Sequence, residues 1–515
     1  MELRTKRFAY WKTAFLSTLL MGLLIHMPAL LSDIPNHDGL DSMYFDQNMI
    51  TSGRWFLTVA CGFSSYYTIP WVIGILGLVF LACTGVALVE LLGLEDKLLI
   101  ISISGLLAAF PALSSTFAYV FTLDGYMLAM FLAVLSVLLV KKYRYGFWPG
   151  ALCLACSMGT YQAYLSFAVI LSIYMLVLLV MEKGAWKDKI KQGLRYLYMG
   201  VLGCILYFVI LQLLLWIQGK KLADYQGISS MGNAAGRGVL ESIRRMYEDF
   251  VSFFVAGHIV FNNIFSVAAV MLLAIGVCVT ILFLCRRRKW WKKPEFFVII
   301  GLLVVALPVA TNLILLISPD VTYHLLMRYQ WVLYPILMLD FVHRFISEEK
   351  TAGWKAGASG WFLKTCVAAA LILVFNYAVT DNIAYSNLQK RYEKTYAYCI
   401  RLLDRIEQTE GYYPSIPIAM IGVVGDEQFP VTDITGEITG NMIGMSGDSL
   451  LYTGANYQAF MKHYLGATLN FLEPEVMKDI YYSKEYMEMD SFPGPDSVKV
   501  VNGILYVKTE NQSRE

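Results

Sequence analysis

The chain has 515 residues, of which 57% are hydrophobic and 16% are charged, and its mean hydropathy is +0.55. A water-soluble globule needs more polar surface than this composition supplies, and the apolar runs reach the roughly 20 residues that cross a bilayer. We therefore expect an α-helical membrane protein that crosses the bilayer many times. The formal net charge of +2 gives no overall basic field, so nucleic acid is not expected as a partner.

About eleven apolar segments are candidates for transmembrane helices. They lie at about 13–31, 71–93, 98–110, 125–140, 148–158, 162–181, 196–217, 264–285, 296–317, 328–343 and 365–380. Several of them are short for a complete crossing. The first has a longer apolar stretch than a signal-peptide core, so we expect it to be an uncleaved anchor.

Lysine and arginine residues alternate between the connecting loops, and this alternation orients the chain. Four basic residues, from Arg4 to Lys12, precede the first segment, and the even-numbered loops hold most of the others, including the run from Arg286 to Lys293. Basic residues collect on the cytoplasmic side of a membrane. We therefore expect the N-terminus in the cytoplasm and, after an odd number of crossings, the C-terminus outside it.

The loop that follows the first segment, at 33–70, is polar and is predicted to lie outside, directly against the membrane. Its ionisable residues are Asp33, His37, Asp38, Asp41, Asp46 and Arg54. Outer connections are also predicted at 119–124, 159–162, 218–263 and 318–329. We expect these connections to converge on one site with the first loop. Residues 236–254 have the pattern of an amphipathic helix that lies in the membrane interface.

After about Thr380 the composition becomes that of a soluble domain. The predicted elements are helices at 387–409 and 456–465, a buried strand at 416–425, and a two-strand hairpin at 497–508 that turns at Asn502 and Gly503. We therefore divide the chain into a transmembrane domain at 1–380 and a small α/β domain outside the membrane at 381–515.

A carboxylate beside an arginine at the outer membrane surface can accept the proton of an incoming hydroxyl while the cation holds a departing phosphate. Asp38 and Arg54 fit these two roles. A structural interpretation is also open. Acidic residues such as Asp41 stabilise the first turn of a helix, and an arginine beside Trp55 can anchor the chain in the interface.

Other polar residues at outer ends also have two interpretations. Asp124 lies where an ionisable group near hydrocarbon indicates function, but it can equally cap a helix. Tyr161 and Gln162 can hydrogen-bond a sugar or tie helices together. His324 and Arg328 are predicted to share a helical face at positions i and i+4, where Arg328 can contact a phosphate.

Four motifs occur in order along the first third of the chain: NHDGLD at 36–41, GRWF at 53–56, AYVFTLDGYMLA at 118–129 and GTYQAY at 159–164. With them the chain resembles the GtrII-like bacterial glucosyltransferases of the GT-C superfamily. The resemblance implies a multi-pass enzyme of the bacterial cytoplasmic membrane. It would move a hexose, expected to be glucose, from a polyprenyl-phosphate carrier to an envelope polysaccharide, such as an O-antigen or a teichoic acid, on the outer face.

The resemblance also implies roles for individual residues. The family tends to place an acidic pair in the first outer loop, and here that pair appears as His37 and Asp38, so Asp38 is the expected general base of one inverting displacement. Asp124 matches an acidic position before the fourth segment. The expected substrate contacts are Asp41, Arg54, Asp124, Tyr161, Gln162 and Arg328. No cofactor is expected to be required, although Asp38, Asp41 and Asp124 can supply oxygen ligands to a divalent cation.

Two other functions stay open at this point. An envelope polymerase or acyltransferase would work at the same outer face with different chemistry. A lipid or polysaccharide transporter should contain two related halves with paired broken helices, and the sequence shows no such symmetry.

Overall fold

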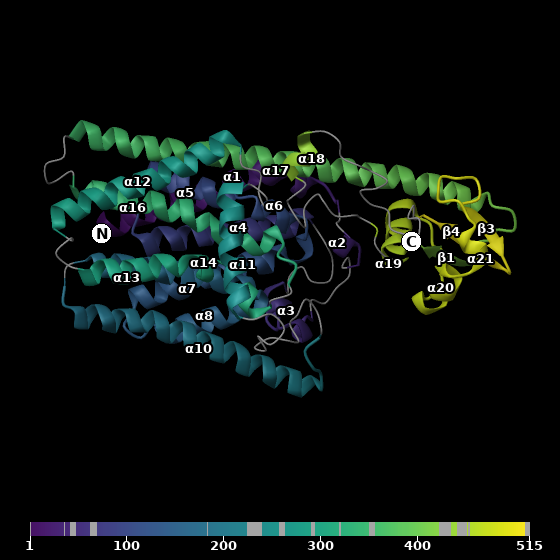
Figure 1. The fold of residues 1–515 in the computed structure, drawn as a ribbon, viewed down its shortest axis with the longest axis horizontal. Coiled ribbons are helices and arrows are strands. Elements are labelled where there is room, and N and C mark those ends of the chain that lie inside the picture. Colours follow the sequence, from purple (N-terminus) through teal and green to yellow (C-terminus); the bar gives the residue numbers. More distant parts are fainter. Residues whose placement is uncertain are drawn as a thin grey trace.

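The computed structural model describes residues 2–34, 37–41, 48–61, 70–182, 184–223, 239–256, 263–289, 294–318, 321–349, 356–421, 434–439, 451 and 454–509. Most of them are helical. The helices run side by side in a long bundle, and a small α/β domain lies beyond one end of it (Figure 1). We call this end of the bundle the domain end.

Eleven helices form the bundle. They are α1 (Glu2–Leu31), α4 (Pro70–Leu92), α5 (Lys97–Ala109), α7 (Leu123–Lys142), α8 (Phe147–Thr160), α9 (Leu165–Met181), α10 (Trp186–Gln218), α12 (Ile264–Arg288), α13 (Pro294–Val305), α16 (Leu333–Glu349) and α17 (Ala356–Glu407). In the described part of the chain, eight helices are long and apolar enough to cross a membrane. Each predicted segment is largely helical, although 296–317 is divided among α13, α14 and α15. The number of crossings stays a prediction, because α5, α8 and α13 have only 13, 14 and 12 residues.

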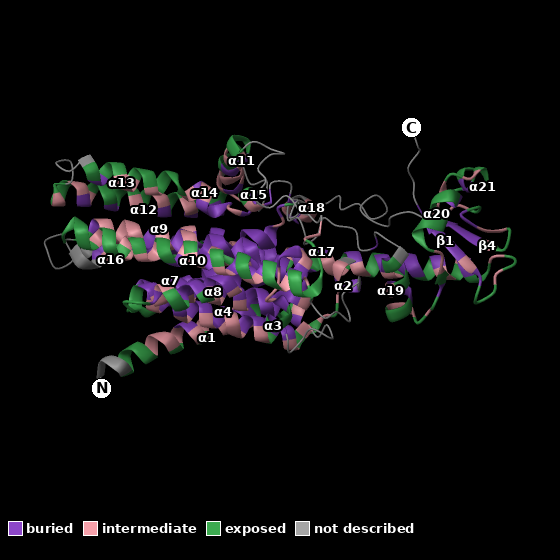
Figure 2. Ribbon diagram, turned by 90° about the horizontal axis from the view of Figure 1, so that it is seen from below, coloured by how far each residue is buried: buried purple, intermediate pink, exposed green. Residues whose placement is uncertain are grey.

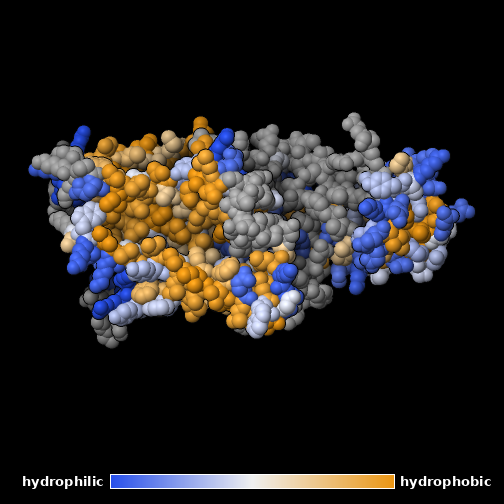
Figure 3. All heavy atoms as spheres, turned by 60° about the horizontal axis from the view of Figure 1, so that its bottom comes forward, coloured by the Kyte–Doolittle hydropathy of each residue, from blue (hydrophilic) through white to orange (hydrophobic). Residues whose placement is uncertain are grey.

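Apolar side chains lie on the outside of the bundle as well as inside it, and this accounts for the high hydrophobic content of the chain. Buried residues concentrate in the middle of the bundle (Figure 2). Large apolar side chains cover much of its outside, including Leu213, Trp216 and Leu282, which are 51%, 79% and 64% exposed. Figure 3 shows this hydrophobic surface between hydrophilic residues at one end and the hydrophilic C-terminal domain at the other. Such a belt suits contact with lipid rather than water.

Short helices connect the long ones. In the described part, six short helices precede α9: α2 (His37–Asp41), α3 (Leu57–Ala60) and α6 (Ala112–Phe117), with the 3₁₀ helices η1 (Ile50–Ser52), η2 (Val120–Thr122) and η3 (Gln162–Tyr164). The second half adds α11 (Val239–Val251), the π-helix η5 (Ser252–Ala256), α14 (Leu307–Thr311), α15 (Ile314–Ile317) and the 3₁₀ helix η7 (Leu325–Val332). The amphipathic helix predicted at 236–254 is confirmed as α11, which lies across the bundle direction in Figure 1.

The C-terminal domain contains a four-stranded sheet in the order β2-β1-β4-β3. Its elements are β1 (Pro417–Ile421), β2 (Asn470–Phe471), β3 (Val498–Val501), β4 (Ile504–Lys508), α19 (Gly454–Leu465), α20 (Pro474–Tyr481) and α21 (Lys484–Met487). The short helix α18 (Ile434–Thr439) lies beside α17 instead (Figure 1). Strand β1 is parallel to β2 and β4, whereas β3 and β4 are antiparallel. The predicted hairpin is confirmed, because Asn502 and Gly503 have the positive φ angles of 50° and 78° that its turn requires.

Helix α17 joins the two parts. The sequence predicted one helix at 365–380 and another at 387–409, but the structure has a single helix of 52 residues that runs along the bundle into the C-terminal domain (Figure 1). The proposed domain boundary at residue 380 therefore falls inside α17. The predicted strand at 416–425 begins as β1, and its residues after Ile421 lie outside the described part.

The first loop also contacts the C-terminal domain. Leu40 of α2 is only 3% exposed, and it belongs to the same hydrophobic cluster as Tyr457 and Phe460 of α19. The first loop and the last domain, which are more than 400 residues apart in sequence, thus share one apolar core. This contact fixes α2 at the domain end of the bundle.

Candidate functional site

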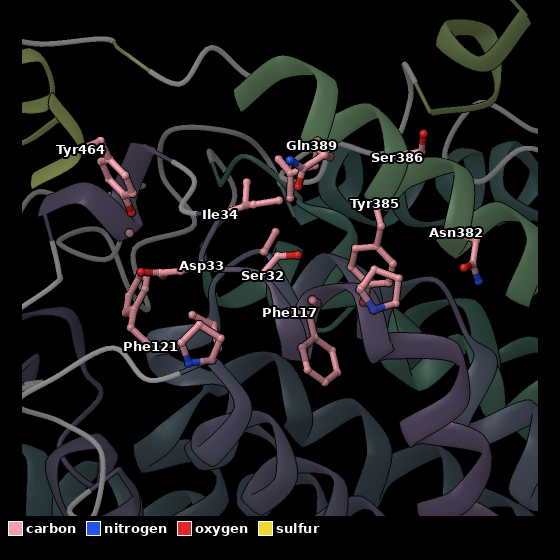
Figure 4. Close-up of a pocket in the computed structure, with 17 residues that line it drawn as sticks. Ser32, Asp33, Ile34, Phe117, Phe121, Asn382, Tyr385, Ser386, Gln389 and Tyr464 are labelled. Atoms are coloured by element: carbon pink, nitrogen blue, oxygen red, sulfur yellow. The ribbon is translucent and has the colours of Figure 1, made fainter. Parts of the chain in front are cut away.

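A pocket of about 270 Å³ opens at the domain end, between the end of α1, the η2 region, α17 and α19 (Figure 4). We call it the α1–α17 pocket. Eleven of its 17 lining residues lie between Pro28 and Phe121, and the other six lie between Asn382 and Tyr464. Two distant parts of the chain therefore build one pocket.

One carboxylate of the first loop, that of Asp33, lines this pocket. Asp33 stays accessible, and partial burial raises the pKa of the Asp33 carboxyl above its usual value. Gly39 of α2 is also part of the wall. Asp38, the predicted base, is its half-buried neighbour in the same helical turn and is not itself among the lining residues. Asp33 was not predicted as a site residue, although its position directly after an apolar segment was a usable signal.

A buried histidine supports two residues of the wall. Nδ1 of His26 lies 2.6 Å from the hydroxyl of Tyr385, and Nε2 lies 2.8 Å from the carbonyl oxygen of Ala108. A carbonyl only accepts, so Nε2 carries the hydrogen and the Tyr385 hydroxyl donates to Nδ1. The His26 ring also stacks on Phe117, with 4.8 Å between the ring centroids. Phe117 and Tyr385 are thereby held in position.

One helical turn before Tyr385, α17 carries a buried acid, Asp381, that was not predicted from the sequence. The hydroxyl oxygen of Ser114 lies 2.7 Å from Oδ1 of Asp381 and 2.8 Å from the carbonyl oxygen of Pro111. Ser114 has one hydroxyl hydrogen for these two acceptors, so a proton on Asp381, donated to Ser114, would make both contacts hydrogen bonds. Asp381 is fully buried and its Oδ2 has no hydrogen-bond partner among the described residues, as expected for a neutral acid.

The GRWF and GTYQ motifs meet in a second cluster, which we call the Arg54 cluster. The side-chain amide of Gln162 donates to the carbonyl oxygen of Ser52 at 3.0 Å and to the hydroxyl of Tyr207 at 3.2 Å. Tyr207 in turn donates to the carbonyl oxygen of Gly53 at 3.1 Å. All four residues are buried. Gln162 therefore ties η1, η3 and α10 together, which is the structural interpretation of this residue.

Arg54 lies on aromatic rings in the same cluster. Its Nη1 donates to the hydroxyl of Tyr126 at 3.3 Å, and its guanidinium lies 4.9 Å from the centroid of the Tyr161 ring. The two tyrosine rings stack at 4.3 Å. Asp124 is 1% exposed and accepts the backbone N–H of Gly125 at 2.8 Å. The structure thus brings Arg54 and Tyr161 together and places Asp124 in the packed start of α7.

Arg328 has other partners. It forms an ion pair with Asp249 of α11, and its guanidinium lies 3.6 Å from the centroid of the Tyr323 ring. It is 5% exposed. The prediction that His324 and Arg328 share an α-helical face is wrong, because η7 begins after His324, has 3₁₀ geometry and is kinked at Arg328. Positions i and i+3, rather than i+4, lie in line on a 3₁₀ helix.

Metal ligands do not gather in the part of the chain that the structure describes. Across those ranges, no group of three or more His, Cys, Asp or Glu side chains could hold a metal ion. The side chains of His37 and Asp41 and the whole of Asp46 lie outside the described residues. The substrate contact expected of Asp41 therefore stays a prediction.

The family model described as Glucosyl transferase GtrII matches residues 27–342, which is more than half of the chain. No curated protein and no solved structure matches. The matched range contains every site residue predicted from the sequence and the first group of pocket residues, from Pro28 to Phe121. It ends before α17 begins.

Proposed function

The chain belongs to the GtrII family of glucosyltransferases, and we propose that it transfers glucose from a polyprenyl-phosphate carrier to an envelope polysaccharide on the outer face of the cytoplasmic membrane. Family membership supports the glucosyl group and the enzyme class. The apolar helices support a site at a membrane surface. The identity of the lipid carrier, of the acceptor and of the catalytic and substrate-binding residues is what we propose.

The orientation is inferred from basic side chains at the end of the bundle opposite the α1–α17 pocket. There Lys141, Arg288 and Arg344 donate to carbonyl oxygens at the C-terminal ends of neighbouring helices, those of Leu91, Met181 and Leu92 respectively. Cations stabilise helix C-termini, and their accumulation indicates the cytoplasmic side. The pocket at the other end would then face outward.

The reaction needs one base and one leaving group. A hydroxyl oxygen of the acceptor attacks the anomeric carbon, the bond from that carbon to the phosphate oxygen breaks, and the phosphate leaves with the electron pair. The hydroxyl proton passes to a carboxylate, for which we propose Asp38. A lipid-linked donor reaches such a site within the membrane, so no nucleotide-binding element is needed. The apolar wall residues Phe117, Val120 and Phe121 suit the first carrier units beside the phosphate.

The placement of α2 is the observation that carries the proposal. Gly39 lies in the pocket wall, and Leu40 is buried in the C-terminal core. These two contacts hold the short helix that carries Asp38 next to the pocket, and they support Asp38 as the base. Asp33 of the same loop lines the pocket. A base in a defined position beside a cavity is what a single displacement requires.

Purified protein tests the proposal with polyprenyl-phosphate glucose and a nucleotide-linked glucose offered separately. We expect transfer to envelope polysaccharide from the lipid donor only. Asp38→Asn keeps the shape but removes the proton acceptor, so it should lower the transfer rate by roughly 10²- to 10⁴-fold. Asp33→Asn is the matched control and should lower it less. Transfer from the nucleotide donor alone, or an Asp38→Asn variant within a few-fold of the parent, would contradict the proposal.

A further inference from the structure

The α1–α17 pocket has two chemically different halves, and we propose that the half formed by α17 and α19 binds the acceptor glycan through neutral polar side chains. The binding groups are Asn382, Ser386 and Gln389 on α17, with Tyr464 on α19 (Figure 4). The ligand is a saccharide that presents uncharged hydroxyl groups. This inference rests on the proposed function, because it assigns one of the two substrates of that reaction.

The three α17 residues form one row. They stand at positions i, i+4 and i+7, which share a face of an α-helix. Asn382 and Ser386 are exposed and Gln389 is half-buried, although each of them lines the pocket. The row therefore lies along one wall of a cavity that a ligand can enter, and α17 supplies a rigid support for it.

The two amides are already oriented. Nδ2 of Asn382 donates to the carbonyl oxygen of Ala378 at 2.8 Å, and Nε2 of Gln389 donates to Oε1 of Glu393 at 2.8 Å. In both cases the amide nitrogen is used within the helix, so the amide oxygen can accept a hydroxyl hydrogen from a ligand. Groups held in the binding geometry before the ligand arrives cost less entropy on binding.

The lining of this half matches a neutral sugar. Its six residues are Asn382, Tyr385, Ser386, Leu388, Gln389 and Tyr464, and none of them carries a charge at neutral pH. Amide and hydroxyl groups pair with sugar hydroxyls, whereas an anionic ligand would call for arginine or lysine. The opposite half contains the carboxylate of Asp33 and the aromatic rings of Phe117 and Phe121.

The extent of the family match indicates which substrate lies in which half. The family is defined by its glucosyl group, and its range of 27–342 contains the half with Asp33. The α17 half lies entirely beyond that range. A feature shared by the family, the glucosyl donor, is thus expected at the first half. The acceptor, which the family description does not specify, is expected at the second.

Transfer kinetics test the assignment. The donor is polyprenyl-phosphate glucose, and the acceptor probe is delipidated envelope polysaccharide from cells that lack the gene. The double variant Asn382→Ala and Gln389→Ala removes two hydrogen bonds to the ligand, so KM for the polysaccharide should rise about 10-fold. KM for the lipid donor should change less than about two-fold. Lys390→Ala, next to Gln389 and exposed but not in the pocket wall, is the matched control and should change neither constant.

A second variant fills the same half. Ser386→Trp should lower kcat/KM for the polysaccharide by at least about 10-fold while KM for the lipid donor is kept, because an indole occupies the space of a sugar ring. Unchanged polysaccharide constants in both variants would overturn the inference, and so would a rise in the donor KM alone. If the parent protein transfers nothing from the lipid donor, the proposed function fails instead, and this is visible before any variant is measured.

Discussion

The α1–α17 pocket and the Arg54 cluster both contain residues of the family-like motifs, and they differ in how their polar groups are satisfied. In the Arg54 cluster, Gln162 bonds to Ser52 and Tyr207, and all three side chains are buried. In the pocket wall, Asn382 and Ser386 are exposed. A polar residue that is buried and fully bonded holds the fold, whereas one that is fixed and still accessible can meet a substrate.

The largest effect on stability is expected from replacing Gln162 of the Arg54 cluster, and replacing Gln389 of the pocket wall is the matched control. Gln162→Ala removes the amide that donates to the buried Ser52 carbonyl and Tyr207 hydroxyl, and only Tyr207 keeps another partner among the described residues, the Gly53 carbonyl. It should therefore destabilise the protein by about 2–4 kcal/mol. Gln389→Ala removes a surface side chain and should change stability by less than about 0.5 kcal/mol. The measurement is the thermal unfolding midpoint of the detergent-purified protein.

Transfer activity of Gln162→Ala distinguishes the two interpretations of Gln162, a tie between helices and a sugar contact. If it mainly ties helices, the fraction of Gln162→Ala that stays folded should transfer glucose within about three-fold of the parent rate. A variant of normal stability that has lost transfer would instead identify Gln162 as a sugar contact, as its position in an outer turn first suggested. The comparison between the cluster and the pocket would then be wrong.

The sequence predicts the helices much better than the contacts between them. Apolar runs of about 20 residues identify α4 and α10 directly, because burying such runs in lipid decides their structure. The continuity of α17 was missed since the composition turns polar after Thr380, while the backbone continues as a helix with neither proline nor glycine in that stretch. A change from apolar to polar composition shows where a helix leaves the lipid, but it does not show where the helix ends.

The pocket itself was only half predictable. Its first half follows a motif, because His37 to Asp41 comes directly after an apolar segment. Its second half depends on the apolar core that Leu40 shares with Phe460, and no local pattern encodes the association of residues so distant in sequence. Asp381 was overlooked for a similar reason. Its partner Ser114 is 267 residues away, so the sequence shows an acid beside a predicted boundary rather than a bonded pair.

An intermediate effect on stability is expected from substitutions at Asp381 and Ser114. If Asp381 is a neutral acid, Asp381→Asn preserves its shape and charge and should change stability by less than about 1 kcal/mol. Ser114→Ala removes the one hydrogen-bond partner recorded for this acid in the described part and should cost about 1–3 kcal/mol. Both variants are compared by thermal unfolding at neutral pH. A marked stabilisation by Asp381→Asn would show that the parent buries an ionised carboxylate.

The smallest effect concerns Asp33 in the pocket wall, and it is a dependence on pH. Partial burial raises the pKa of this carboxyl in the folded protein above its value in the unfolded chain. At a pH below both values the group is protonated in either state and has no effect. As the pH rises through the unfolded pKa and then the folded one, ionisation favours the unfolded chain, so Asp33 lowers stability in that window.

The effect of Asp33 on stability is small because its side chain is accessible. Asp33→Asn should therefore flatten the fall in unfolding midpoint between about pH 4 and 6, where carboxyl groups titrate. A steeper fall in the variant would mean that a cation partner stabilises the ionised Asp33, and this residue would then belong with the bonded groups of the Arg54 cluster rather than with the accessible groups of the pocket.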